Sequence, residues 1–138
     1  MSNSKLAYWC FKLVLGISFA AHGAVRIPKL HDVAQGISDQ FAETVLSGMP
    51  SLTMGYVIPI AEVVCGMFIL VGNRVMRYGL AGGILLMGVL MFGTCILEKW
   101  EWLPSQLLHA LAFYLLLQNK HTPSEKNWMK NDGTKNEV

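Results

Sequence analysis

Charged residues are scarce in this chain. They make up 14% of its 138 residues, whereas a soluble domain of this size carries about 25% to cover its surface. Hydrophobic residues account for 53%, and they occur in long blocks. The length suits one domain, and the pattern is typical of an integral membrane protein, not of a water-soluble globule. The net charge of +2 and the lack of a basic stripe argue against a nucleic-acid partner.

Cysteines are also few. Cys10, Cys65 and Cys95 lie far apart in apolar stretches, without a CxxC pair or the Cys/His spacing of a zinc site. A membrane enzyme that exchanges disulfides needs an attacking and a resolving thiol side by side, so the sequence argues against that class. We interpret the three cysteines as small packing residues.

Four apolar segments are candidates for membrane spans, namely 6–25, 52–71, 78–97 and 102–117. A span needs about 20 residues, with about 17 as a practical minimum, so the fourth segment is the shortest. The first could instead be a signal peptide, but it is longer than the usual apolar region of one, and a lysine interrupts it. We therefore predict an all-α, four-helix membrane bundle over residues 1–118, followed by a polar, flexible cytoplasmic tail over residues 119–138.

The basic residues predict the orientation of this bundle. With four spans, eight of them share one side of the membrane: Lys5, Lys12, Arg74, Arg77, Lys120, Lys126, Lys130 and Lys135. The other side holds three: Arg26, Lys29 and Lys99. Cytoplasmic loops carry the excess of basic residues, so we expect a multi-pass protein of the bacterial inner membrane with both termini in the cytoplasm. Lys12 lies inside the first span, and we expect it to snorkel to the inner interface.

The connection between the first two spans is too long for a simple turn. Apolar residues recur there every four positions, at Val33, Ile37, Phe41 and Val45. This spacing predicts an amphipathic helix on the outer membrane surface, over about 32–47, ended by Gly48 and Pro50. Such a helix could simply cover one end of the bundle, or it could act as a lid over a site beneath.

Small residues repeat at helical spacing within the spans. Gly79 and Gly83 are four apart, and so are Gly16, Ala20 and Ala24. In lipid, such residues let helix backbones approach closely. The pattern predicts close packing within the bundle, or between copies in a homo-oligomer.

Three ionisable side chains besides Lys12 fall inside the spans, and such residues are rare and costly in lipid. At 1.5 Å per residue, His22, Glu62 and His109 all lie in the outer half of the membrane. We therefore predict that they form one polar site. They could share a proton, bind the oxygens of a quinone, or bind a metal. A metal is the least favoured because no close His/Glu spacing supports it, and a purely structural polar network is the alternative to function.

The residues around this site resemble a known family. The first span reads Lys12-Leu13-x-x-Gly16-x-x-Phe19-x-x-His22-Gly23-x-x-Arg26, and the loop ends in Gly48-x-Pro50. The second span contributes Glu62, Gly66, Gly72 and Arg74. In this order, the motifs are similar to those of the DoxX family, which includes the DoxD-like subunits of thiosulfate:quinone oxidoreductase. The family's usual arginine is replaced by Lys12, and Arg74 stands one position early.

The resemblance implies a four-helix bacterial inner-membrane protein linked to sulfur oxidation, quinone or oxidative-stress chemistry. It implies functional roles for His22 and Glu62, with Arg26 beside them at a quinone site, whereas His109 rests on the depth argument. We expect a subunit of a quinone-linked membrane oxidoreductase, which takes electrons from a small donor or a partner protein. One alternative is a non-catalytic membrane anchor for soluble redox enzymes. Another is a small proton-coupled exporter, although such exporters carry their carboxylate in the first helix.

Overall fold

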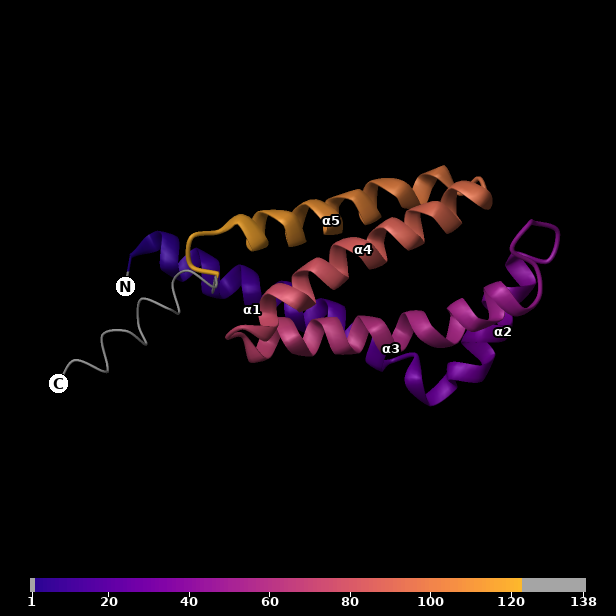
Figure 1. Ribbon diagram of the computed structural model, residues 1–138, viewed down its shortest axis with the longest axis horizontal. Coiled ribbons are helices and arrows are strands. Elements are labelled where there is room, and N and C mark those ends of the chain that lie inside the picture. Colours follow the sequence, from indigo (N-terminus) through magenta and orange to yellow (C-terminus); the bar gives the residue numbers. More distant parts are fainter. Residues whose placement is uncertain (1, 123–138) are drawn as a thin grey trace.

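The computed structural model describes residues 2–122, and these form helices and turns without a strand. Four long helices dominate the chain (Figure 1), with a shorter one between the first two. The helices are α1 (Asn3–Ala24), α2 (Leu30–Gln40), α3 (Met49–Val71), α4 (Val75–Ile96) and α5 (Leu103–Gln118). Two single 3₁₀ turns, η1 (Ile27–Lys29) and η2 (Trp100–Trp102), precede α2 and α5. The all-α prediction is confirmed.

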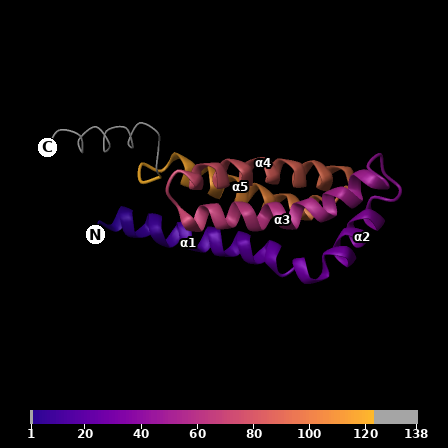
Figure 2. The ribbon, with the colours of Figure 1, turned by 60° about the horizontal axis from the view of Figure 1, so that its bottom comes forward.

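The long helices run alternately in opposite directions (Figure 2). α1 packs on α3, α3 on α4, and α4 on α5. The start of α1 lies against the residues that follow α5, where the rings of Tyr8 and His121 are 5.6 Å apart. We call this end, with the α3–α4 turn, the terminal end of the bundle. The opposite end carries η1, α2 and η2, and we call it the α2 end.

Close helix packing depends on glycine, as the sequence predicts. A side chain at Gly66 of α3 would collide with the backbone of Ala20 in α1, and one at Gly23 of α1 would collide with the carbonyl of Pro59. Between α3 and α4, a Cβ atom at Gly79 would lie 2.7 Å from the carbonyl oxygen of Cys65. These contacts let α1, α3 and α4 meet backbone to backbone.

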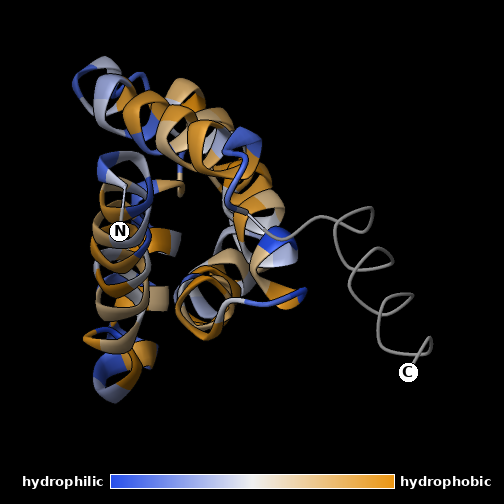
Figure 3. Cartoon of the chain, turned by 90° about the vertical axis from the view of Figure 1, so that its left-hand side faces the viewer, coloured by the Kyte–Doolittle hydropathy of each residue, from blue (hydrophilic) through white to orange (hydrophobic). Residues whose placement is uncertain are grey.

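In the part of the chain that the structure describes, three helical segments are long and apolar enough to cross a membrane: α3, α4, and the segment Asn3–Gln40 that contains α1. α5 has only 16 residues. However, η2 leads directly into it, and residues 100–118 together extend about 30 Å, which is the thickness of a bilayer's hydrocarbon core. Figure 3 shows hydrophobic residues along all four long helices, and many of their large apolar side chains are exposed. An apolar exterior of this kind suits lipid.

The amphipathic helix is shorter than the predicted range of 32–47. α2 ends at Gln40, turns follow over 41–48, and Val45 is 87% exposed. Val33, Ile37 and Phe41 of the predicted apolar row line a cavity, whereas Val45 lies in the exposed turns beyond the helix.

α2 is fixed to α3 by a small-residue contact. Ala34 is completely buried, and a Cβ atom at Gly55 of α3 would lie 3.0 Å from that of Ala34. The imidazole of His31 is also hydrogen-bonded to the hydroxyl of Tyr56 at 2.6 Å. α2 therefore covers the end of the bundle as a fixed wall.

Lys12 is buried in the protein, and its side chain extends to the terminal end of the bundle. It is 4% exposed, and its Nζ lies 4.7 Å from the centre of the Trp9 ring. The same ammonium group is next to Gly72, at the end of α3, where the helix dipole favours a cation. Beyond α5, Thr122 is also buried. The first residues after Gln118 thus fold back onto the bundle, and the rest of the predicted tail, 123–138, lies outside the described residues.

Candidate functional site

A cavity of about 740 Å³ lies between the helices at the α2 end. It forms because α3 and α4 are in backbone contact near Gly79 but diverge towards α2, as Figure 1 shows. An edge-on contact between Phe19 of α1 and Phe113 of α5, with ring centres 4.9 Å apart, lies on the terminal side of the cavity. The volume is in the range of small-molecule sites. Most of the lining is apolar, including Phe19, Val33, Ile37, Phe41, Leu46, Met54, Ile58, Met87 and Leu90.

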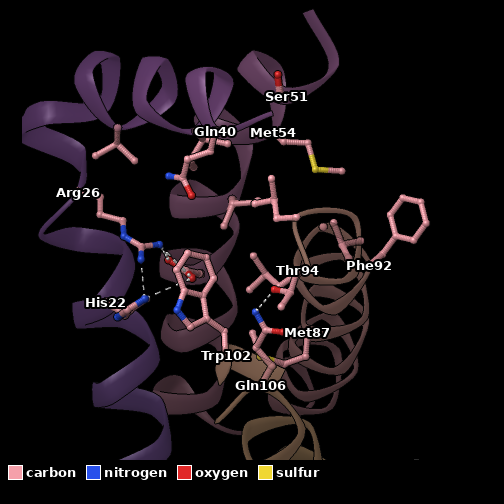
Figure 4. Close-up of a pocket in the computed structure, with 18 of the residues that line it drawn as sticks. His22, Arg26, Gln40, Ser51, Met54, Met87, Phe92, Thr94, Trp102 and Gln106 are labelled. Carbon is pink, nitrogen blue, oxygen red and sulfur yellow. Dashed lines mark hydrogen bonds and ion pairs between the residues drawn. The ribbon is translucent and has the colours of Figure 1, made fainter. Parts of the chain in front are cut away.

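Ser18 and Ser51 also line the α1–α3 wall of the cavity, and its larger polar side chains are those of His22 and Arg26, both labelled in Figure 4, and of Glu62. We call these last three residues the Arg26 cluster. Glu62 is 1% exposed, and Arg26 Nη1 donates to its Oε2 at 3.2 Å and to its Oε1 at 3.5 Å. Arg26 lies in the turn between α1 and η1, four residues after His22, so both side chains reach the same stretch of α3. The carboxylate of Glu62 is thereby paired inside the bundle.

Arg26 also contacts His22. Its Nη2 lies 2.8 Å from His22 Nε2, and a guanidinium can only donate. His22 Nε2 is therefore the acceptor, and a neutral His22 carries its proton on Nδ1. The same Nε2 lies 3.9 Å from Glu62 Oε1. If Nε2 took up a proton, it would lose Arg26 as a donor and gain the carboxylate as a partner.

His109 lines the same cavity from α5. Its Nδ1 donates to the carbonyl oxygen of Ser105 at 2.7 Å, because a carbonyl can only accept. This bond leaves Nε2 of a neutral His109 as an acceptor. The structure thus brings the three sequence-predicted residues to one cavity, but only His22 and Glu62 contact each other, through Arg26.

The α4–α5 wall contains a polar pair that the sequence analysis did not identify. Gln106 Nε2 donates to Thr94 Oγ1 at 2.8 Å, and both residues line the cavity. The other amide atom, Gln106 Oε1, is buried without a hydrogen-bond partner. The sequence prediction rested on ionisable groups, so it did not include the neutral side chains of Thr94, near the end of α4, and Gln106, near the start of α5. Their polarity within largely apolar segments was the available signal.

The donor set of the site does not favour a metal. Within residues 2–122, no group of three or more His, Cys, Asp or Glu side chains is placed to hold a metal ion. Arg26 also contacts both His22 and Glu62, so a permanent positive charge stands where these two ligands would bind a cation.

Comparison with known proteins adds no relative. No protein-family model matches the chain, and no curated protein or solved structure is significantly similar to it. The resemblance to the DoxX family rests on the motif residues of the first two spans.

Proposed function

We propose that this chain is a DoxX-like protein of the bacterial inner membrane that binds a quinone in the cavity at the α2 end. It would act as a subunit of a quinone-linked oxidoreductase system in sulfur oxidation or oxidative-stress defence. The observation that carries this proposal is a mainly apolar cavity with a buried, paired carboxylate in its wall. Charged groups inside membrane helices mark functional sites by default.

The residues present fit a quinone. Its ring and tail are apolar, which matches most of the cavity lining. Its carbonyl oxygens accept hydrogen bonds, and Arg26 offers donors in the cavity wall. Buried polar atoms without a partner are rare in proteins, so the unpaired Gln106 Oε1 also favours a ligand that carries a donor, as a quinol does.

When bound, a quinone supplies a reversible conversion to the quinol that takes up two electrons and two protons. The chain has no recognisable motif for haem, flavin or nicotinamide, so the electrons would come from a small donor or from a redox partner protein. Side chains of this protein would take up and release the two protons. Glu62 is held by Arg26, and His22 Nε2 lies between the guanidinium and the carboxylate, so a proton can be exchanged between the imidazole and Glu62 with small side-chain movements.

The same arrangement supports the proposed membrane setting. Residues 100–118 would form the fourth span beside the three apolar segments described above. Within residues 2–122, the α2 end carries three basic residues, Arg26, Lys29 and Lys99, and the terminal end carries five, Lys5, Lys12, Arg74, Arg77 and Lys120. By the positive-inside rule, the cavity would lie in the outer half of the membrane, with both termini in the cytoplasm.

Quinone binding can be measured on the purified protein in lipid nanodiscs. Trp102 lines the cavity, so duroquinone should quench its fluorescence with a saturable concentration dependence. The Trp102→Phe variant should lose most of this saturable signal. Trp9→Phe should keep it, because Trp9 lies at the terminal end of the bundle, away from the cavity. A linear quench that is the same in both variants would indicate partition into lipid and would contradict the proposal.

A further inference from the structure

The cavity has two polar walls on different helices. The Arg26 cluster comes from α1, the turn after it and α3, whereas Thr94 and Gln106 belong to α4 and α5. Both sets line the same space, and Figure 4 shows His22 and Arg26 on one side of it and Thr94 and Gln106 on the other. A ligand that fills the cavity would therefore meet polar groups at both walls.

The Thr94–Gln106 pair offers one donor and one acceptor. Thr94 is 4% exposed, and its Oγ1 accepts the amide hydrogen of Gln106. The hydroxyl hydrogen of Thr94 is not used in that bond, so it remains a donor. Gln106 Oε1 is buried and unpartnered, so it remains an acceptor.

We propose that Thr94 and Gln106 bind the second oxygen of a ligand whose first oxygen is bound by the Arg26 cluster. This inference rests on the proposed function and narrows the ligand to para-quinones and their quinols. A carbonyl oxygen accepts from the Thr94 hydroxyl, and a quinol hydroxyl donates to Gln106 Oε1. The pair therefore serves both redox states of the same oxygen without changing its own protonation.

A ligand with a single polar group does not account for this geometry. A fatty acid or a sterol that pairs with Arg26 would place only apolar atoms against the opposite wall. Gln106 Oε1 would then remain buried and unpaired, which is costly. A ligand with an oxygen at each end of a flat ring would form hydrogen bonds with both polar walls. It would thereby link the α1–α3 half of the bundle to the α4–α5 half.

Three matched probes test the inference: duroquinone, durohydroquinone and 2,3,5,6-tetramethylphenol, which differs from the quinol by the loss of one hydroxyl. Their affinities would be measured by anaerobic titration calorimetry on the full chain in nanodiscs. Gln106→Met should weaken durohydroquinone about five- to tenfold, the loss of one buried hydrogen bond. Thr94→Val should weaken duroquinone by a similar factor. Neither variant should change the affinity for the phenol. Thr53→Val, a matched change at an exposed position of α3 outside the cavity lining, should leave all three affinities unchanged.

The possible failures are distinguishable. If none of the three probes binds saturably to the wild-type chain, the proposed function fails, and the inference with it. If the probes bind but the two variants weaken the phenol as much as the two-oxygen probes, or weaken none of them, only the inference is overturned. Thermal melts show whether Gln106→Met still folds. If it does not, the inference is tested with the isosteric variant Thr94→Val, which should weaken the binding of duroquinone but not of the phenol.

Discussion

The guanidinium of Arg26 joins the two helices that carry the candidate site. It lies 3.2 Å from the Glu62 carboxylate of α3 and 2.8 Å from the His22 imidazole, one turn earlier on α1. The two site residues that the sequence analysis placed at one depth are thus connected through a third. Substitutions of Arg26, His22 and Glu62 can therefore separate the effect of each side chain on the stability of the fold from its effect on proton chemistry at the site.

Arg26→Met should destabilise the protein because it leaves the buried Glu62 carboxylate without its partner. Breaking a fully buried ion pair costs about 3–5 kcal/mol; Arg26 is partly exposed, so we expect about 2 kcal/mol. Adding Glu62→Gln removes the unpaired charge and should restore most of the stability. Thermal unfolding in detergent measures both effects. A double variant as unstable as the sum of the two single variants would contradict this account.

His22 and His109 should couple differently to Glu62. In a double-mutant cycle with Glu62→Gln, His22→Ala should give a non-additive change in stability of about 0.5 kcal/mol or more. His109→Ala should be additive, because the Nδ1 bond of His109 goes to Ser105 in its own helix. The single variant Glu62→Gln should assemble normally, but it should lose the quinone-linked activity that we propose for the protein. Additive losses for His22 in both stability and function would mean that His22 and Glu62 do not share a site.

Gly36→Phe should block the cavity without disturbing the fold. Gly36 lines the cavity, and a Cβ atom there has no neighbour within 4 Å. Replacing a helical glycine also gains up to about 1 kcal/mol of helix propensity, so the melting temperature should not fall. Duroquinone affinity should drop more than tenfold. Gly88→Phe is the matched control, because Gly88 is equally open but is not part of the cavity lining, and it should bind normally.

Gly66→Val should prevent α1 and α3 from packing. Any side chain at this position meets the backbone of Ala20, which cannot move aside as a flexible side chain would. Overpacking costs about 1–3 kcal/mol, and a backbone collision should be at the upper end of this range or worse. The yield of monodisperse protein and its melting temperature measure the effect, with Gly36→Ala as the tolerated control. Wild-type stability of Gly66→Val would show that the two helices do not meet as described.

Reporter fusions test the number of spans. A fusion after Val138 should behave as cytoplasmic, and one inserted at Ser47, in the exposed turns after α2, should behave as periplasmic. If the short α5 did not cross the membrane, the Val138 fusion would be periplasmic instead. That result would exclude the four-span arrangement.

Much of the fold could be predicted from the sequence. The apolar blocks predicted the long helices to within a few residues, because burial in lipid or in a bundle requires a continuous apolar helix. The close approach of helices at Ala20 and Gly79 followed from residue size. The cost of polar groups in lipid also drew attention to His22, Glu62 and His109, which the structure places around one cavity.

Other features were decided only by the tertiary structure. Position along a span gives depth, but it does not give the rotation of a helix about its axis or the partner that a side chain selects. For that reason, the sequence did not reveal that Arg26 lies between His22 and Glu62, or that Thr94 meets Gln106 across two helices. It also did not place Lys12 against the end of α3. Nor did the four-residue pattern show that α2 ends at Gln40, or that Ala34, which lies outside the pattern, is the residue that packs on α3.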